Sequence, residues 1–220
     1  MDFEVFETRE RALADNEAAA AQTRADLRAR GAKLVNLMGS PGAGKTTLLL
    51  RLIEALKPLR VGVMEADVDS DVDARTVAQA GAKVIQLHTA GLCHMDADMT
   101  RRGLERLGLD GLDVVFLENI GNLVCPAEFE VGADLRLVVL SVPEGDDKPL
   151  KYPLMFRIAD GLAVNKVDAL PIFDFDLDAL KSRVAALRPD APVFPLCART
   201  GAGVDALAEW LKARLGGDGA

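Results

Sequence analysis

Short runs of apolar residues alternate along the chain with longer stretches in which apolar residues recur every three or four positions. A short apolar run bounded by turn residues predicts a buried strand, and the wider spacing predicts an amphipathic helix. Strands are expected at residues 33–38, 61–66, 84–87, 113–118, 135–140, 161–165 and 193–196. Helices are expected at residues 47–56, 73–79, 96–107, 177–187 and 204–215. This alternation predicts the α/β fold class, with a doubly wound, mostly parallel sheet covered by helices on both faces.

The N-terminal segment has a different pattern. Residues 2–30 are rich in Ala, Arg, Glu and Asp, and Leu13, Ala20 and Leu27 recur at a spacing of seven. This spacing predicts one helix with a narrow apolar stripe, ended by a glycine. The stripe is compatible with packing on the domain, with contact to a partner, or with a solvated helix. We therefore divide the chain into an N-terminal helix, residues 1–32, and a domain of residues 33–220.

Composition and charge narrow the possible partners. The chain has 220 residues and a net charge of −8, which argues against binding to nucleic acid or to an anionic membrane surface. No apolar run is long enough to span a membrane, and the N-terminus has no signal-peptide pattern. Three cysteines without a paired framework indicate a reducing compartment and leave thiols available for metal binding. A cytoplasmic protein is expected.

A phosphate-binding loop follows the first predicted strand. Residues 39–47 read GSPGAGKTT and fit the pattern G-x-x-x-x-G-K-[ST] between a strand and a helix, which is the context that the motif requires. Its glycines allow backbone N–H groups to approach a polyphosphate, and the helix N-terminus adds partial positive charge. Lys45 is expected to contact the β- and γ-phosphates and to act in catalysis, and the Thr46 hydroxyl to bind Mg²⁺. The nucleotide-binding residues predicted here are Gly39, Gly42, Ala43, Gly44, Lys45, Thr46 and Thr47.

A second motif predicts which base the site reads. Residues 165–168 read NKVD after an apolar strand, and N-K-x-D is the guanine-reading motif of GTPases. A carboxylate at Asp168 can accept hydrogen bonds from the ring N–H and the exocyclic amine of guanine, and adenine offers no such pair. Asn165 and Lys166 complete this predicted site. Residues 197–201, CARTG, resemble the S-A-K loop that contacts the base, with Cys197, Ala198 and Arg199 in its three positions.

Acidic residues follow two strands near the phosphate loop. Glu118 ends one strand and is expected to bind Mg²⁺ directly or through water, in the place where GTPases usually carry D-x-x-G. Gly121 can approach the γ-phosphate through its N–H. Asp67 is a second candidate for binding Mg²⁺ or orienting water, and Asp73 is a third catalytic candidate. Asp69 and Asp71 are interpreted as solvated charges.

Cys93, His94 and Cys125 form a predicted transition-metal site. The chain has only two histidines, and one of them is next to a cysteine. Thiolate and imidazole donors suit Zn²⁺ or Ni²⁺. Cys125 lies four residues beyond Gly121, so a loop that senses nucleotide is expected to move a metal ligand. Asp98 is a possible weak fourth ligand.

Five motifs together resemble the hydrogenase nickel-incorporation GTPases, the hydrogenase accessory protein B family. In order, they are residues 39–47, 93–97 (CHMDA), 118–126 (ENIGNLVCP), 144–148 (EGDDK) and 165–168. The resemblance implies a cytoplasmic P-loop GTPase with a G domain of the SIMIBI type, which uses GTP and Mg²⁺ and forms a GTP-dependent homodimer. It also implies a Ni²⁺ or Zn²⁺ site at the dimer interface. The function implied is Ni²⁺ delivery to the large subunit of [NiFe]-hydrogenase with a zinc-binding accessory protein.

The chain departs from that family at two points. Many members carry a further histidine ligand where this chain has Asp98, and some carry an N-terminal histidine tract or cysteine motif, whereas residues 1–32 contain neither residue type. A nickel-storage role is therefore not predicted. Two other functions fit the motifs. One is a urease-type nickel chaperone, whose metal motif usually reads C-P-H. The other is a nucleotide-regulated, metal-binding scaffold for which turnover is unimportant.

Overall fold

The computed structural model describes residues 8–67, 72–89 and 91–216. Its centre is one parallel sheet with the strand order β3-β2-β4-β1-β5-β6-β7. The strands are β1 (Lys33–Gly39), β2 (Val61–Asp67), β3 (Lys83–His88), β4 (Val114–Glu118), β5 (Leu135–Ser141), β6 (Gly161–Asn165) and β7 (Val193–Pro195). The predicted α/β class and parallel, doubly wound sheet are confirmed.

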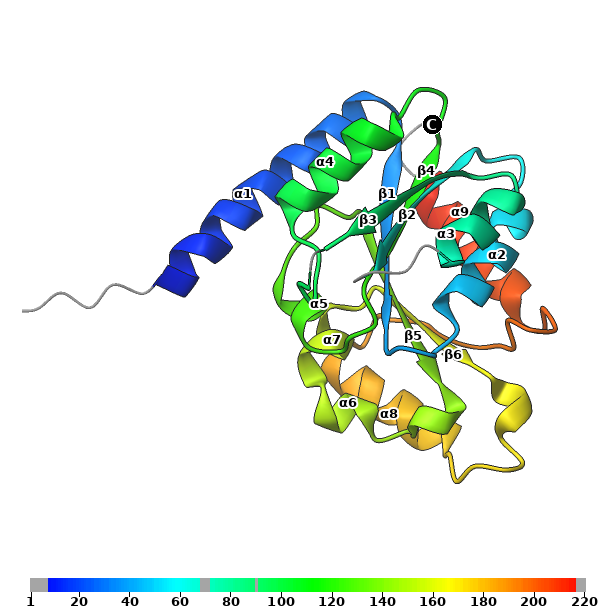
Figure 1. Cartoon of the computed structure of the whole chain (residues 1–220). Helices are drawn as coiled ribbons and strands as arrows, with labels where there is room; N and C mark the ends of the chain where they lie inside the picture. Colours follow the sequence, from blue (N-terminus) through cyan, green and yellow to red (C-terminus); the bar gives the residue numbers. More distant parts are fainter. Residues whose placement is uncertain (1–7, 68–71, 90, 217–220) are drawn as a thin grey trace, which may run out of the picture.

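Helices cover both faces of this sheet (Figure 1). One face carries α2 (Lys45–Ala55), α3 (Val72–Gln79) and α9 (Val204–Leu215). The other carries α1 (Thr8–Ala29) and α4 (Ala97–Leu107) over one half, and α7 (Pro153–Ile158) and α8 (Leu177–Leu187) over the other half. Two further short helices are α5 (Cys125–Glu128) and α6 (Lys148–Lys151). Neither these two nor α7 is predicted by the hydrophobic pattern.

The strands are buried because helices pack on both of their sides. In β4, Val114 and Phe116 face α2 and α9, whereas Val115 and Leu117 face α1 and α4. All four are fully buried. A strand that alternates between two covered faces must be apolar at nearly every position, as expected in parallel sheets. Glu118, at the carboxyl end of β4, is the polar exception in this strand.

The N-terminal helix packs against the domain. Ala20 and Leu27, which belong to the predicted stripe, are fully buried, and Leu27 joins the core between β1 and α4. Arg24 forms a 3.0 Å ion pair with Glu130. The side chain of Leu13 lies outside the described residues. The stripe therefore buries at least two of its three members against this chain.

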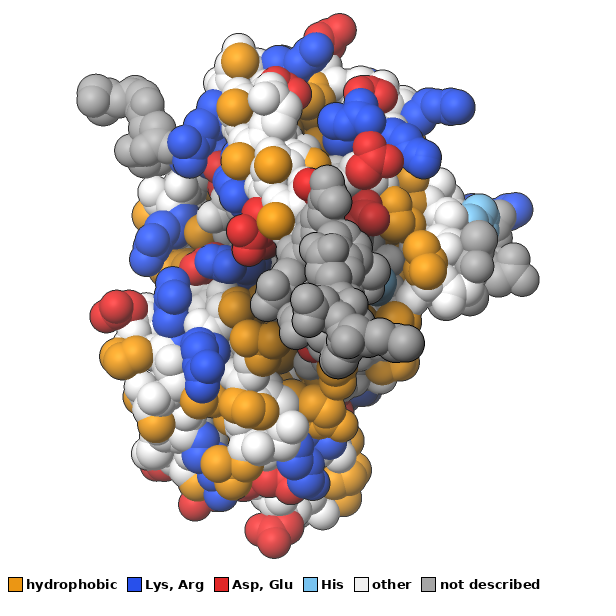
Figure 2. All heavy atoms as spheres, turned by 90° about the vertical axis from the view of Figure 1, so that its left-hand side faces the viewer, with side chains coloured by type: hydrophobic (Ala, Val, Ile, Leu, Met, Phe, Trp, Pro, Cys, Tyr) orange, Lys and Arg blue, Asp and Glu red, His pale blue; other side chains and the backbone are white. Residues whose placement is uncertain are grey.

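The surface carries both signs of charge. On the face shown in Figure 2, Lys and Arg side chains are interspersed with Asp and Glu. Among the described residues, no helix combines the length and the apolar character that crossing a membrane requires.

Candidate functional site

The phosphate loop joins β1 to α2 in a conformation that depends on glycine. Gly42 and Gly44 have φ angles of 74° and 92°, in the left-handed region that favours glycine. A Cβ on Gly44 would also collide with the Asn165 side chain, and one on Gly39 with the Val139 carbonyl. The α2 helix starts directly after Gly44. The loop is thus closely fitted to the strands beside it, with the helix N-terminus at its end.

A cavity of about 630 Å³ opens over this loop. It is lined by the phosphate loop, the ends of β2 and β4, and the segment after β4 that contains Gly121. Lys45 is buried, with only 7 % of its surface exposed. Its Nζ donates to the carbonyls of Gly39 and Ser40 at 3.4 and 3.3 Å. Both distances are long for hydrogen bonds, so the ammonium group beside the cavity is held only weakly by these two carbonyls.

The predicted Mg²⁺ residues Thr46 and Glu118 meet in this cavity. The Thr46 hydroxyl donates a 2.9 Å hydrogen bond to Glu118 Oε1. Asp67 also lines the cavity, at the end of β2. The backbone of Asp73 lies in α3, but its side chain is outside the described residues. The oxygen donors of Thr46, Glu118 and Asp67 fit the hard, oxygen-binding character of Mg²⁺.

Glu65 belongs to the same cavity and was not singled out by sequence reasoning. It is paired in register with Glu118 across β2 and β4, and the two residues are 3 % and 6 % exposed. Two carboxyl groups on neighbouring strands therefore line the cavity that also contains Thr46. Residues 65–73 read EADVDSDVD and contain five acidic residues, and only the strand register shows that Glu65 is the one next to Glu118.

The predicted base-reading residues are brought together by Asn165. Its Nδ2 donates to the Ala43 carbonyl of the phosphate loop at 2.9 Å, and its Oδ1 accepts from the Ala198 N–H at 2.9 Å. Lys166 adopts a left-handed backbone, with φ of 62°, and its Nζ donates to the Gly42 carbonyl at 2.6 Å. The amide side chain therefore fixes the phosphate loop and the CARTG loop relative to each other.

Asp168 lies at the edge of a second cavity, of about 320 Å³, together with residues of the CARTG loop. An Arg199 nitrogen donates to Asp168 Oδ2 at 2.8 Å. Hydrogen bonds from Cys197 and from Arg199 hold the pKa of the Asp168 carboxyl below its ordinary value. The carboxylate is thus kept ionised and able to accept hydrogen bonds from a base.

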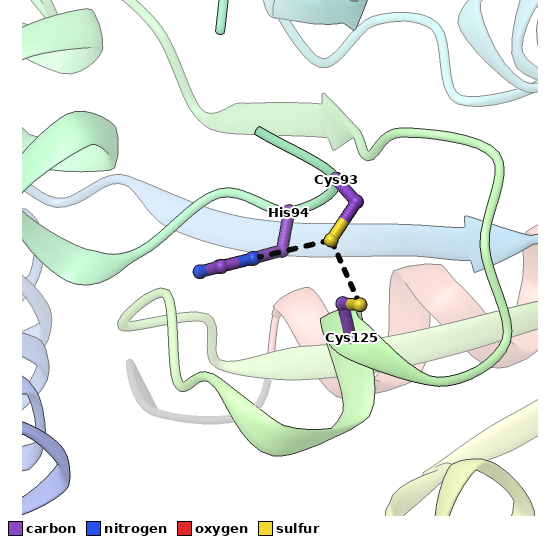
Figure 3. Close-up of side chains that lie close together, drawn as sticks. All are labelled: Cys93, His94 and Cys125. Carbon is purple, nitrogen blue, oxygen red and sulfur yellow. Dashed lines mark hydrogen bonds between the residues drawn. The ribbon is translucent and has the colours of Figure 1, made fainter. Parts of the chain in front are cut away.

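The three predicted metal ligands converge, as Figure 3 shows. Their donor atoms all lie within 4.8 Å of one another. The Cys93 and Cys125 sulfurs are 2.8 Å apart, and Cys93 Sγ lies 3.8 Å from His94 Nδ1. Two thiols and an imidazole in this arrangement fit Ni²⁺ or Zn²⁺. Cys93 and His94 come from the segment before α4, and Cys125 is the first residue of α5.

Neighbouring groups influence the charge of these ligands. The imidazole of His94 stacks on the Phe129 ring, with centroids 3.8 Å apart and an interplanar angle of 16°. Burial lowers the pKa of His94, which favours the neutral form that binds metal. The hydrogen bond with Cys93 raises the pKa of the Cys125 thiol. A bound cation would reverse that effect, because it stabilises the thiolate.

Asp98 does not join the metal group. It lies in the first turn of α4, where its carboxylate pairs with Arg101 at 2.7 Å and with Arg102 at 3.2 Å. The hydrogen bond from Arg101 is the main reason that the pKa of Asp98 is lowered. In this arrangement the carboxylate is directed to two arginines of its own helix, and the role of Asp98 as a weak fourth ligand stays a prediction.

Residues 33–195 match the family model described as "CobW/HypB/UreG, nucleotide-binding domain". The chain is 43% identical over 206 residues to a hydrogenase maturation factor HypB of Azotobacter chroococcum mcd 1, covering 93% of this chain and 67% of that protein. It is 38% identical over 189 residues to the hydrogenase/urease maturation factor HypB of Helicobacter pylori (strain J99), covering 84% of this chain and 78% of that protein.

A solved structure has the same architecture. The crystal structure of HypB from Helicobacter pylori in complex with nickel superposes with a TM-score of 0.86 at 35% sequence identity. The match covers 91% of this chain and 95% of that one. Sequence and structure comparisons therefore point to the same group of proteins.

Proposed function

The chain belongs to the HypB members of the CobW/HypB/UreG family, and from this premise we propose that it is a GTP-hydrolysing metallochaperone. Its function is to deliver Ni²⁺ during maturation of [NiFe]-hydrogenase. Two findings support this assignment: the relatives are hydrogenase maturation factors, and the related Helicobacter pylori protein forms a complex with nickel.

One observation carries the proposal: a nucleotide cavity and a soft-metal group are joined by one short segment. Glu118 and Gly121 line the nucleotide cavity, and Cys125 follows them in the metal group. A chain that only hydrolysed nucleotide would have no need of two thiols and an imidazole beside that segment. A chain that only bound metal would have no need of the phosphate loop.

Within the site, each residue has a role that its position supports. Lys45 and the loop N–H groups bind the phosphates, while Thr46, Glu118 and Asp67 hold Mg²⁺, which would neutralise charge on the transferred phosphoryl group. Asp168 reads guanine, with Asn165 holding the two loops in place. Cys93, His94 and Cys125 bind Ni²⁺, with Zn²⁺ as the competing ion.

A second copy of the chain completes the metal site in this proposal. The described part of one chain supplies three donors, fewer than the four of a closed tetrahedral site. Leu92 and Val124, next to Cys93 and Cys125, are 50% and 49% exposed. Exposed apolar side chains beside an incomplete metal group suit a two-fold contact in which each cysteine meets its mate. GTP binding promotes this homodimer, and a zinc-binding accessory protein and the hydrogenase large subunit are the other partners in a cytoplasmic pathway.

Complementation tests this function. The chain is expressed in a hydrogenase-producing bacterium that lacks its own HypB, and hydrogenase activity is measured at low nickel. Restored activity is expected for the unchanged chain and not for Lys45→Ala or Cys125→Ala. Failure to restore hydrogenase activity, together with restored urease activity in a urease-producing host, would favour the urease alternative. The Helicobacter pylori relative, a hydrogenase/urease maturation factor, is the reason for testing urease. Full restoration by Lys45→Ala would favour the scaffold alternative.

A further inference from the structure

Arg51 connects the helix of the phosphate loop to the loop that faces the base. It lies on α2, the helix that begins with Lys45. Its Nε donates to the Ala198 carbonyl at 3.0 Å, and a terminal nitrogen donates to the Arg199 carbonyl at 2.7 Å. One guanidinium therefore binds two consecutive carbonyls of the CARTG loop. The proposed function assigns no role to this residue.

These two bonds determine how the loop presents its other groups. In a planar trans peptide, the carbonyl of one residue and the N–H of the next point in opposite directions. By fixing the Ala198 and Arg199 carbonyls, Arg51 also fixes the direction of the N–H groups of Arg199 and Thr200. The guanidinium is a rigid, planar fork, so it restrains both peptide units together. A more flexible donor would restrain them less.

The restrained loop carries the side chain that contacts Asp168. Arg199 donates to Asp168 at 2.8 Å, and Ala198 and Arg199 both line the base cavity. On the other side, the Ala198 N–H is held by Asn165. The backbone of Ala198 and Arg199 is thus hydrogen-bonded to Asn165 through one N–H and to Arg51 through two carbonyls. Without Arg51, the Ala198 and Arg199 carbonyls would lose these two bonds, while the bonds of the Ala198 N–H to Asn165 and of Arg199 to Asp168 would remain.

We propose that Arg51 is a positioning residue for guanine recognition, which holds the CARTG loop in register with the helix that binds the phosphates. The inference rests on the proposed GTP-binding function. Arg51 is not among the residues that line the nucleotide cavity or the base cavity, so its effect is transmitted through the loop backbone. Replacing it is expected to weaken the choice of base while leaving phosphate binding unchanged.

Three variants separate this role from a general effect on folding. Arg51→Met keeps the aliphatic stem and removes the donors, and Arg51→Lys returns a cation with a less restrained geometry. Lys57→Met is the control, because Lys57 lies just past the end of α2 and pairs with Glu54 of that helix. Thermal unfolding of each variant reports whether the fold is kept.

The measurement is competitive binding of GDP, ADP and inorganic tripolyphosphate to each full-length protein. In Arg51→Met, the ratio of GDP to ADP affinity is expected to fall about tenfold or more, as for loss of hydrogen bonds made by a charged group. Tripolyphosphate affinity stays unchanged, Arg51→Lys recovers part of the ratio, and Lys57→Met matches the unchanged chain.

An unaltered GDP to ADP ratio in Arg51→Met overturns the inference alone, and so does an equal loss of affinity for all three ligands. A lack of GDP preference in the unchanged chain overturns the proposed GTP function as well, so the two failures are distinguishable. If Arg51→Met unfolds, Arg51→Lys decides: a base preference intermediate between GDP-selective and unselective supports the inference, and full preference contradicts it.

Discussion

The backbone N–H of Asn122 donates a 3.1 Å hydrogen bond to the carbonyl of Gly39. Gly39 is the first residue of the phosphate loop, and Asn122 lies between Gly121 of the nucleotide cavity and Cys125 of the metal group. The segment that carries a metal ligand is therefore bonded to the loop that receives the phosphates. Movement of one loop strains the bond to the other, which gives nucleotide and metal a physical connection.

The first prediction concerns base choice. The Asp168 carboxylate can accept hydrogen bonds from both the ring N–H and the exocyclic amine of guanine, and adenine lacks this donor pair. GTP is therefore expected to bind at least roughly 10³-fold more tightly than ATP. Asp168→Asn should shift the preference toward xanthosine nucleotides, whose extra carbonyl accepts from an amide. Competition binding with GTP, ATP and xanthosine triphosphate measures the base preference of both proteins. Equal affinity of the unchanged chain for ATP and GTP would show that the site does not read guanine.

Turnover provides the second prediction. Lys45→Ala is expected to abolish GTP hydrolysis without unfolding the chain, because Lys45 donates only long bonds to two loop carbonyls. No arginine of the described residues lines the nucleotide cavity, so the unchanged chain alone should hydrolyse GTP at roughly 10⁻⁴ to 10⁻² s⁻¹. Single-turnover phosphate release gives the rate. A value above about 1 s⁻¹ would reveal a catalytic group that the present assignment lacks.

The third prediction concerns Mg²⁺. Glu118→Gln keeps an oxygen that can accept from the Thr46 hydroxyl but removes the negative charge of the carboxylate. The Mg²⁺ concentration for half-maximal hydrolysis should therefore rise roughly 10- to 100-fold, the range for partners of metal ligands. Glu105→Gln is the control, since Glu105 pairs with Arg101 on the surface of α4. A titration of Mg²⁺ at saturating GTP compares the two. The same midpoint in both variants would exclude Glu118 from the Mg²⁺ site.

The ligand set for nickel is the subject of the fourth prediction. Cys93→Ala and Cys125→Ala should each lower Ni²⁺ affinity by more than the roughly 10- to 100-fold that is lost when a residue bonded to a metal ligand is replaced. Asp98→Ala should leave that affinity unchanged, because the carboxylate is paired with Arg101 and Arg102. Equilibrium dialysis against Ni²⁺ measures all three. A large loss in Asp98→Ala would mean that this side chain leaves the arginines and binds the ion.

Most of the fold follows from the sequence because buried parallel strands must be apolar and turn residues mark their ends. The strand 161–165 is predicted with the bounds that β6 has in the structure. The short helices α5 and α6 are missed because four residues each are too few to show a periodic pattern.

The candidate site divides in the same way between local and long-range information. Its motif residues could be predicted because each motif is contiguous. The pairing of Glu65 with Glu118 and the bonds from Arg51 to Ala198 and Arg199 depend on strand register and tertiary packing, which no local pattern records. The diversion of Asp98 was readable, since arginines three and four residues later on a helix lie on the same side.

Nucleotide state is expected to control nickel binding through the segment between Glu118 and Cys125. Isothermal titration of Ni²⁺ and of Zn²⁺ into the protein bound to GDP, and into the protein bound to a non-hydrolysable GTP analogue, tests it most directly. We expect a difference of about 1–3 kcal/mol in metal-binding free energy between the two forms, and linkage requires metal to change nucleotide affinity by the same factor. Cys125→Ala should lose both the metal binding and this difference. Identical affinities in the two forms, or full Ni²⁺ binding by Cys125→Ala, would contradict it.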